Sequence, residues 1–244
     1  KNAKPSQVSD TFAGTVDPRL GINLTWTENT PTAPAFADLD IRGYIIKRGV
    51  NYGNGTLIGE FKSTSVIIPT LPSPAEDSQT YTIKAVDTDG NESELARSSG
   101  AISLVNPSPV VEGTISHEFK DDNLTINWEA PALTAGQFAV KEYEVFNDNQ
   151  SLGITSSTTF SLPVTFDSDF IFKIKTIDII GKSSTATTKT IAFVKASAPN
   201  ISFIFEGTKL RLMWTAPTQG SMKIKEYEIR RSAANISDIS GAAF

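Results

Sequence analysis

The sequence contains no cysteine and only one histidine, His117, among its 244 residues. Without cysteine the chain can form neither disulfide bonds nor thiolate metal sites. A single histidine has no second imidazole to share a metal ion, and we interpret His117 as an exposed residue near the end of a strand, beside Glu118. No apolar run approaches the roughly 18 residues that a transmembrane helix needs. We therefore expect no metal, no other cofactor and no membrane insertion.

Positive charge is scarce and scattered. The chain has 22 Lys and Arg against 27 Asp and Glu, a formal net charge of −5, and it contains no basic run of five or more residues. Because proteins that bind nucleic acid normally carry a basic stripe, we expect no nucleic-acid partner. No Gly-x-Ser-x-Gly nucleophile turn occurs either, and we expect no enzymatic activity from these residues.

The sequence does contain a two-part signature that occurs three times. The first part is an alternating run that ends in tryptophan, at Trp26, Trp128 and Trp214. The second part is an aliphatic-x-x-Tyr-x-aliphatic segment, with its tyrosines at Tyr44, Tyr143 and Tyr227. The spacing of the copies is about the length of one small β-sandwich, so the signature predicts an array of β modules.

Alternation between apolar and polar residues, bounded by turn residues, predicts seven strands in the first copy. They are Val8–Gly14, Gly21–Thr27, Ile41–Gly49, Thr56–Phe61, Thr64–Pro69, Thr80–Asp87 and Ala96–Val105. The second copy repeats this order between Val110 and Val194. Short strands at regular spacing, with no convincing helical pattern, indicate antiparallel sandwiches.

These residues resemble fibronectin type III domains. The resemblance rests on the tryptophan of the second strand, the tyrosine of the third, and the Tyr-x-Ile-x-Ala-Val-Asp segment of residues 81–87 followed by Gly90-Asn91-Glu92-Ser93. It implies an all-β chain of tandem immunoglobulin-like sandwiches, two complete and one partial. We place the modules at residues 1–106, 107–196 and 197–244. The joints contain Asn106-Pro107-Ser108-Pro109 and Ala196-Ser197-Ala198-Pro199, and proline should make them semi-rigid.

The repeated aromatic residues invite two interpretations, as sugar-stacking platforms or as core. Their positions at the inward ends of alternating strands favour the core, because burying one aromatic side chain removes about 150–250 Å² from water. We therefore predict a structural core that contains Trp26, Tyr44, Tyr81, Trp128, Tyr143, Phe172, Trp214 and Tyr227.

The segment Asp87-Thr88-Asp89-Gly90-Asn91-Glu92 superficially resembles a calcium-binding loop. Its glycine is fourth, whereas an EF-hand loop needs glycine sixth and glutamate twelfth. The second copy has Asp178-Ile179-Ile180-Gly181 in this place. We interpret both segments as turns, since Asp, Asn and Gly suit tight turns.

The third module has only its first three strands in the sequence, from about Pro199 onward. Because half a sandwich would leave its core open, and the sequence begins with Lys1 rather than Met, we expect this chain to be a piece of a longer one. The alternative is that strands from another subunit complete the module.

The third strands and the Asp87–Ser93 segment are similar to type III modules of bacteriophage tail-tip and tail-fibre proteins. This resemblance implies a virion protein that acts extracellularly in host attachment. Its expected partners are other virion or surface-assembly proteins, further copies of the chain in a trimer, and a cell-surface receptor or glycan. The Gly-Asn-Glu-Ser sequence also occurs in modules of secreted bacterial polysaccharide-degrading enzymes. The alternative is therefore that these are linker modules of a secreted glycan-active enzyme or a surface protein.

Overall fold

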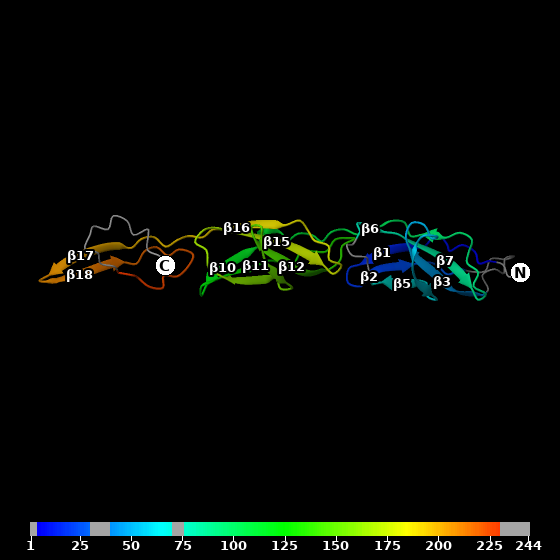
Figure 1. Cartoon of the computed structure of the whole chain (residues 1–244), viewed down its shortest axis with the longest axis horizontal. Coiled ribbons are helices and arrows are strands. Elements are labelled where there is room, and N and C mark those ends of the chain that lie inside the picture. The colour runs from blue at the N-terminus through cyan, green and yellow to red at the C-terminus, as the bar shows by residue number, and fades with distance from the viewer. Residues whose placement is uncertain (1–3, 30–39, 70–75, 230–244) are drawn as a thin grey trace. The chain divides into compact units, whose positions relative to one another are not determined.

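The computed structural model describes residues 4–29, 40–69 and 76–229. Almost all regular structure in these ranges is β (Figure 1). A single short 3-10 turn, Glu112–Thr114, interrupts the strands of the described residues. No helix in the described part of the chain is long and apolar enough to cross a membrane.

The first sandwich has one three-stranded and one four-stranded antiparallel sheet, with strand orders β1-β2-β5 and β4-β3-β7-β8. A third, two-stranded sheet joins β6 to β9. The strands are β1 Ala13–Asp17, β2 Gly21–Thr25, β3 Ile41–Arg48, β4 Thr56–Phe61, β5 Ser65–Ile68, β6 Ser78–Gln79, β7 Tyr81–Asp87, β8 Arg97–Ser98 and β9 Ile102–Ser103.

The inner faces of these sheets form one hydrophobic core. On β2, Ile22 and Leu24 are buried and Asn23 between them is less so, as the two-residue period of a strand requires. On the opposite sheet, Tyr44 and Ile46 of β3 occupy the matching inward positions. This alternation fixes the register, because a shift by one residue would turn every apolar side chain outward.

The second sandwich repeats this topology, with sheets β10-β11-β14 and β13-β12-β15-β16. Its strands are β10 Ser116–Lys120, β11 Asn123–Asn127, β12 Val140–Asn147, β13 Gln150–Thr155, β14 Thr159–Pro163, β15 Phe170–Asp178 and β16 Thr187–Ile191. Both sandwiches even share a β-bulge where the third strand begins, between Ile41 and Gly43 and between Val140 and Glu142. The chain is therefore built of tandem immunoglobulin-like sandwiches of the fibronectin type.

The described part of the third module is a hairpin of β17 (Asn200–Glu206) and β18 (Lys209–Thr215). The expected third strand, around Ile224–Ile229, is not a strand in the structure. In the first sandwich the corresponding strand, β3, pairs with β4 on one side and β7 on the other. The described residues of the third module supply neither neighbour, so this segment has no ladder to join.

Two strand predictions in the first module were wrong in their bounds. The expected strand Val8–Gly14 is displaced to Ala13–Asp17, because the Asp17↔Gly21 pair sets the register of the first hairpin. The expected strand Ala96–Val105 is split into β8 and β9, which belong to different sheets. The chain changes sheet at Gly100, whose φ of 71° a residue with a side chain rarely adopts.

The chain divides into two compact units. The first comprises Lys1–Ser116, Ile126–Phe160 and Ile171–Thr190, and the second comprises His117–Thr125, Ser161–Phe170 and Ile191–Phe244. The division runs through the second sandwich. Each unit therefore contains one of the two inter-module linkers together with the residues that contact it.

Candidate functional site at the module joints

Six of the eight aromatic residues predicted as core are buried. Trp26 and Trp128 each lie edge-on to the tyrosine of the following strand, at centroid distances of 5.4 Å from Tyr44 and 5.3 Å from Tyr143. Phe172 lies on the other side of Trp128, at 6.0 Å. Tyr81 is fully buried, but its hydroxyl has no hydrogen-bond partner among the described residues. Burial raises the pKa of Tyr81 to about 12.

Trp214 and Tyr227 differ from this expectation, since each is 40% exposed. Their rings still contact each other, at a centroid distance of 5.6 Å. The contact between the Trp and Tyr of the signature therefore occurs in all three copies. The exposure arises because no second sheet covers this hairpin within the described residues.

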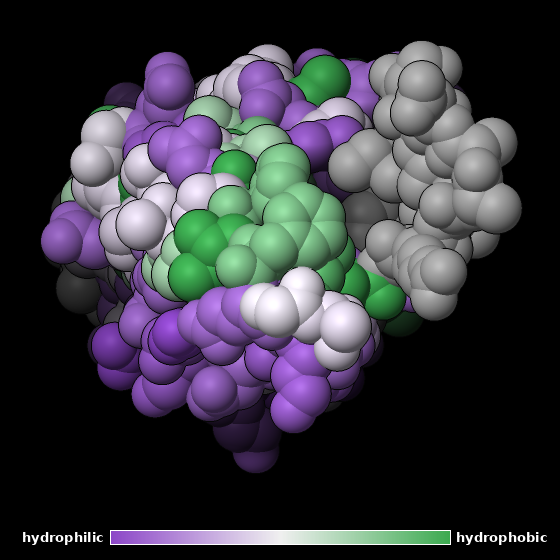
Figure 2. All heavy atoms as spheres, turned by 90° about the vertical axis from the view of Figure 1, so that its left-hand side faces the viewer, coloured by the Kyte–Doolittle hydropathy of each residue, from purple (hydrophilic) through white to green (hydrophobic). Residues whose placement is uncertain are grey.

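The β17–β18 hairpin has one entirely apolar face. Register places Ile201 opposite Trp214 and Phe203 opposite Leu212, and all four are at least one-third exposed. Figure 2 shows apolar surface gathered beside a hydrophilic area at this end of the molecule. By its alternation this is the inward face of a sandwich.

The Asp87 turn, which superficially resembles a calcium loop, and the matching Asp178 turn are both held by hydrogen bonds within the turn. Asp87 accepts hydrogen bonds from the backbone N of Asn91 at 2.7 Å and from its Nδ2 at 2.9 Å. Asp178 accepts two backbone bonds through Oδ1, from Ile180 at 3.0 Å and Lys182 at 2.8 Å. No cluster of three or more His, Cys, Asp or Glu suited to a metal ion occurs in the described ranges.

These two buried aspartates have opposite pKa shifts. Burial is the largest influence on Asp87, but hydrogen bonds from the Asn91 side chain and from the backbone of residues 89–91 outweigh it and lower its pKa. Burial dominates at Asp178 and raises its pKa, against weaker opposing effects from the turn backbone and Lys182. The cause is visible in the geometry, since Asp178 Oδ2 is buried without a hydrogen-bond partner among the described residues.

The first joint is built around a loop between β11 and β12, residues 134–139. At its centre, Phe138 is 0% exposed and belongs to the hydrophobic core of the first sandwich. Backbone bonds fix the loop on both sides of this ring. Val105 N donates to Gly136 O at 2.9 Å, and Ala139 N donates to Pro18 O at 2.8 Å. A side chain of the second module therefore completes the core of the first.

Gln137 connects the same loop to the linker. It is only 4% exposed, and its Nε2 donates to Asn106 O at 2.7 Å. Its Oε1 accepts from the backbone N of Thr134 at 3.0 Å, and the Ser108 hydroxyl lies within hydrogen-bond distance of both ends of the amide. A buried amide with this many partners fixes one geometry, because each lost partner would leave a polar group unsatisfied.

Lys182 makes the third attachment of the first joint. Its Nζ contacts Asp77 Oδ1 at 2.9 Å, Leu104 O at 2.8 Å and Glu76 O at 3.4 Å. Its side chain is only 9% exposed, whereas that of Asp77 is 98% exposed. Three acceptors match the three donors of an ammonium group, so the covered charge is fully hydrogen-bonded.

Sequence reasoning missed Phe138, Gln137 and Lys182. Alternation identifies the inward face of a strand, but these three residues lie in loops and turns outside the strands. The available signal was a local comparison of the copies. Position 91 in the first turn is Asn, and the matching position 182 in the second is Lys.

Comparisons with known proteins give weak structural likenesses and no match by sequence. No protein-family model and no curated protein matches the chain. The Clostridium perfringens spore cortex lytic enzyme SleM is similar over 36% of this chain and 29% of its own, with 18% identity and a TM-score of 0.31. The FN1–FN3 domains of chicken CNTN1 are similar over 79% of this chain and 68% of theirs, with 11% identity and a TM-score of 0.30. Likenesses this weak carry no argument about function.

Proposed function

We propose that this segment is a non-catalytic structural and adhesive spacer in a bacteriophage tail-tip or tail-fibre protein that takes part in host attachment. The observation that best supports a spacer is the first joint, in which Phe138 of one module is a core residue of the preceding one. A shared core couples the two modules more strongly than a proline linker alone would. Such coupling suits a spacer, a segment that holds the domains on either side of it at a set distance.

The phage assignment is supported by the resemblance of the third strands and of the Asp87–Ser93 segment to tail-protein modules. In that setting the partners are other virion proteins, further copies of the same chain in a trimer, and a receptor or glycan on the host surface. The second candidate is a set of linker modules in a secreted bacterial glycan-active enzyme or surface protein. It is favoured by the Gly90-Asn91-Glu92-Ser93 sequence, which also occurs in such modules.

Peptide mass spectrometry of purified phage particles tests the assignment. Trypsin should release the peptide Ala85–Arg97, which lies between Lys84 and Ser98. We expect this peptide in virions at a ratio to the major tail protein that fits a trimer. If it occurs instead in the medium of bacterial cultures free of phage particles, the secreted-protein candidate replaces the phage one.

Adhesion is tested separately with the chain itself. Fluorescently labelled protein should co-sediment with host cells, and periodate or protease treatment of the cells should abolish binding to a glycan or a protein receptor respectively. If the protein binds no cell that the parent phage infects, the adhesive part of the proposal is wrong and only the spacer role remains.

A further inference from the structure

The linker of the second joint has the same sequence pattern as that of the first. Val105-Asn106-Pro107-Ser108 in the first joint matches Val194-Lys195-Ala196-Ser197 in the second. The loops that follow also match, because Thr134-Ala135-Gly136-Gln137-Phe138 aligns with Thr218-Gln219-Gly220-Ser221-Met222. In both copies a Val-x-x-Ser linker is paired with a Thr-x-Gly-x-apolar loop.

The structure pairs these matched segments in the second joint as well. Ser221 N donates to Val194 O at 2.7 Å, and Val194 N donates to Ser221 Oγ at 2.9 Å. A second pair joins the two segments, because Thr218 N donates to Ser197 Oγ at 3.0 Å. Ser221 thus takes the position that Gln137 holds in the first joint, and it too connects loop to linker.

Glycine is required in both loops. A Cβ on Gly220 would lie 1.9 Å from Val194 O and 2.7 Å from Ala196 N, so no side chain fits. A Cβ on Gly136 would meet Val105 Cγ2 at 3.0 Å, and its φ of 82° is one that residues with side chains rarely adopt. Each linker therefore packs directly on the backbone of the next module's loop.

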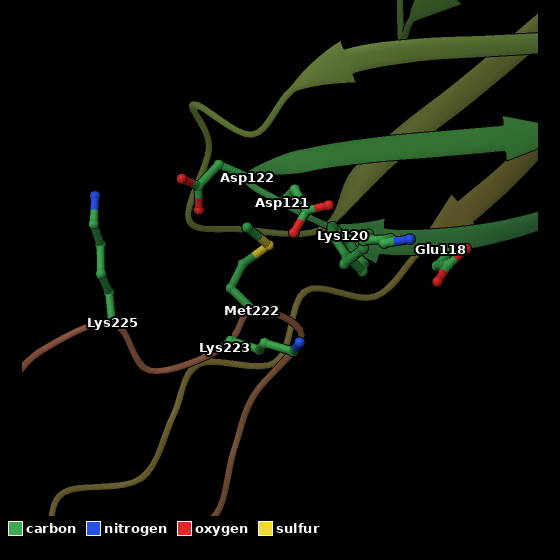
Figure 3. Close-up of a pocket in the computed structure, with 8 residues that line it drawn as sticks. Glu118, Lys120, Asp121, Asp122, Met222, Lys223 and Lys225 are labelled. Carbon is green, nitrogen blue, oxygen red and sulfur yellow. The ribbon is translucent and has the colours of Figure 1, made fainter.

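The apolar residue two positions after each glycine, Phe138 or Met222, lies against the preceding module. Phe138 is fully buried there. Met222 is half-buried and lines, with Phe119, a hollow of about 390 Å³. Figure 3 shows Met222 directed at the Asp121–Asp122 turn, which corresponds to the Pro18 turn that the first loop contacts.

We propose that both joints are made by one repeated device, in which the apolar residue of a Thr-x-Gly-x-apolar loop enters the open end of the preceding module. The stability of each module then depends on the module that follows it. The first joint is the tighter copy, with a large aromatic side chain, a buried glutamine and Lys182. The second carries a smaller side chain and leaves the hollow partly open. This inference is independent of whether the parent is a phage protein or a secreted enzyme.

Hydrogen exchange on the full chain tests the coupling. Phe138→Ala should accelerate exchange at least tenfold in peptides from β2 and β7 of the first module, although residue 138 belongs to the second. The matched control is Val145→Ala, which removes a fully buried side chain of the second module away from the joint. It should accelerate exchange mainly in β12 and β15, with a smaller effect on β2 and β7 than Phe138→Ala. Faster exchange confined to the second module in both variants would overturn the proposal.

The second joint is tested by limited proteolysis at Lys195, in the linker that Gly220 contacts. Gly220→Ala should increase the rate of tryptic cleavage after Lys195 severalfold. Gly113→Ala is the control, because a Cβ there meets nothing within 4 Å, and it should leave the rate unchanged. Equal cleavage rates in the wild type and Gly220→Ala would show that the second linker is not packed on the loop and that the device is not repeated.

Discussion

Replacing Asp178 by asparagine should stabilise the second module at neutral pH. The carboxylate is fully buried, and its Oδ2 has no hydrogen-bond partner among the described residues. Asparagine can keep the two bonds that Oδ1 accepts, from Ile180 N and Lys182 N. Its amide then occupies the Oδ2 position without a charge, so the variant avoids the desolvation of an ion.

The magnitude follows from comparing two buried groups. A neutral polar group left without a partner costs roughly 1–3 kcal/mol, and a charged group costs more. Lys182 recovers part of that difference for the wild type by its positive charge. We therefore expect Asp178→Asn to raise the free energy of unfolding by about 1–2 kcal/mol at pH 7.

The pH dependence gives the sharper test. Because burial raises the pKa of Asp178 above its ordinary 3.8, the ionised carboxylate weakens the folded state at neutral pH. As the pH falls through the raised pKa the folded protein takes up the proton first, and the wild type regains stability. The advantage of Asp178→Asn should therefore shrink as the pH falls from neutral through the raised pKa towards 3.8. Urea denaturation of the full chain measures this, with hydrogen exchange of β15 as the local signal.

Asp87→Asn is the matched control within the same chain. Both Asp87 oxygens accept bonds from Asn91, and an amide there would face another amide donor. Since the pKa of Asp87 is lowered, its contribution is present above 3.8 and is lost as the pH falls through the lowered value. This variant should destabilise the first module at pH 7. If both variants changed stability in the same direction, the assignment of the orphaned oxygen would be wrong.

Five further substitutions can be checked by the same urea titration. Tyr81→Phe should be neutral or stabilising by up to ~1 kcal/mol, because the hydroxyl is buried without a partner, whereas Tyr44→Phe should cost about 1 kcal/mol because its hydroxyl accepts from a backbone N–H. Trp128→Ala should cost about 3–5 kcal/mol and unfold the second module, and a loss of binding at unchanged stability would instead indicate a ligand platform. Lys182→Met should cost about 1–3 kcal/mol by removing a hydrogen bond to the carbonyl of the buried Leu104. Lys173→Met should cost at most ~1 kcal/mol, because Lys173 is more exposed than Lys182.

The sequence was sufficient to predict the sandwiches and much of their core. Trp26 and Trp128 end alternating runs, and alternation places a side chain on the inward face whatever lies opposite. The same reasoning fails for Trp214, because its burial requires a second sheet that alternation in one hairpin cannot supply. It also fails for Phe138, since a pattern within one module cannot show that a loop residue enters the core of another.

The same turn position holds Asn91 in the first module and Lys182 in the second, and the two side chains have different partners. In the first module Asn91 gives its amide to Asp87, and that turn is satisfied by its own residues. In the second module Lys182 directs its ammonium to Leu104 O and Asp77 instead. Asp178 Oδ2 then lacks the partner that Asn91 provides to Asp87. The second turn therefore lacks the side-chain hydrogen bond that the first makes to its aspartate, because the Lys182 side chain bonds to residues of the first module instead.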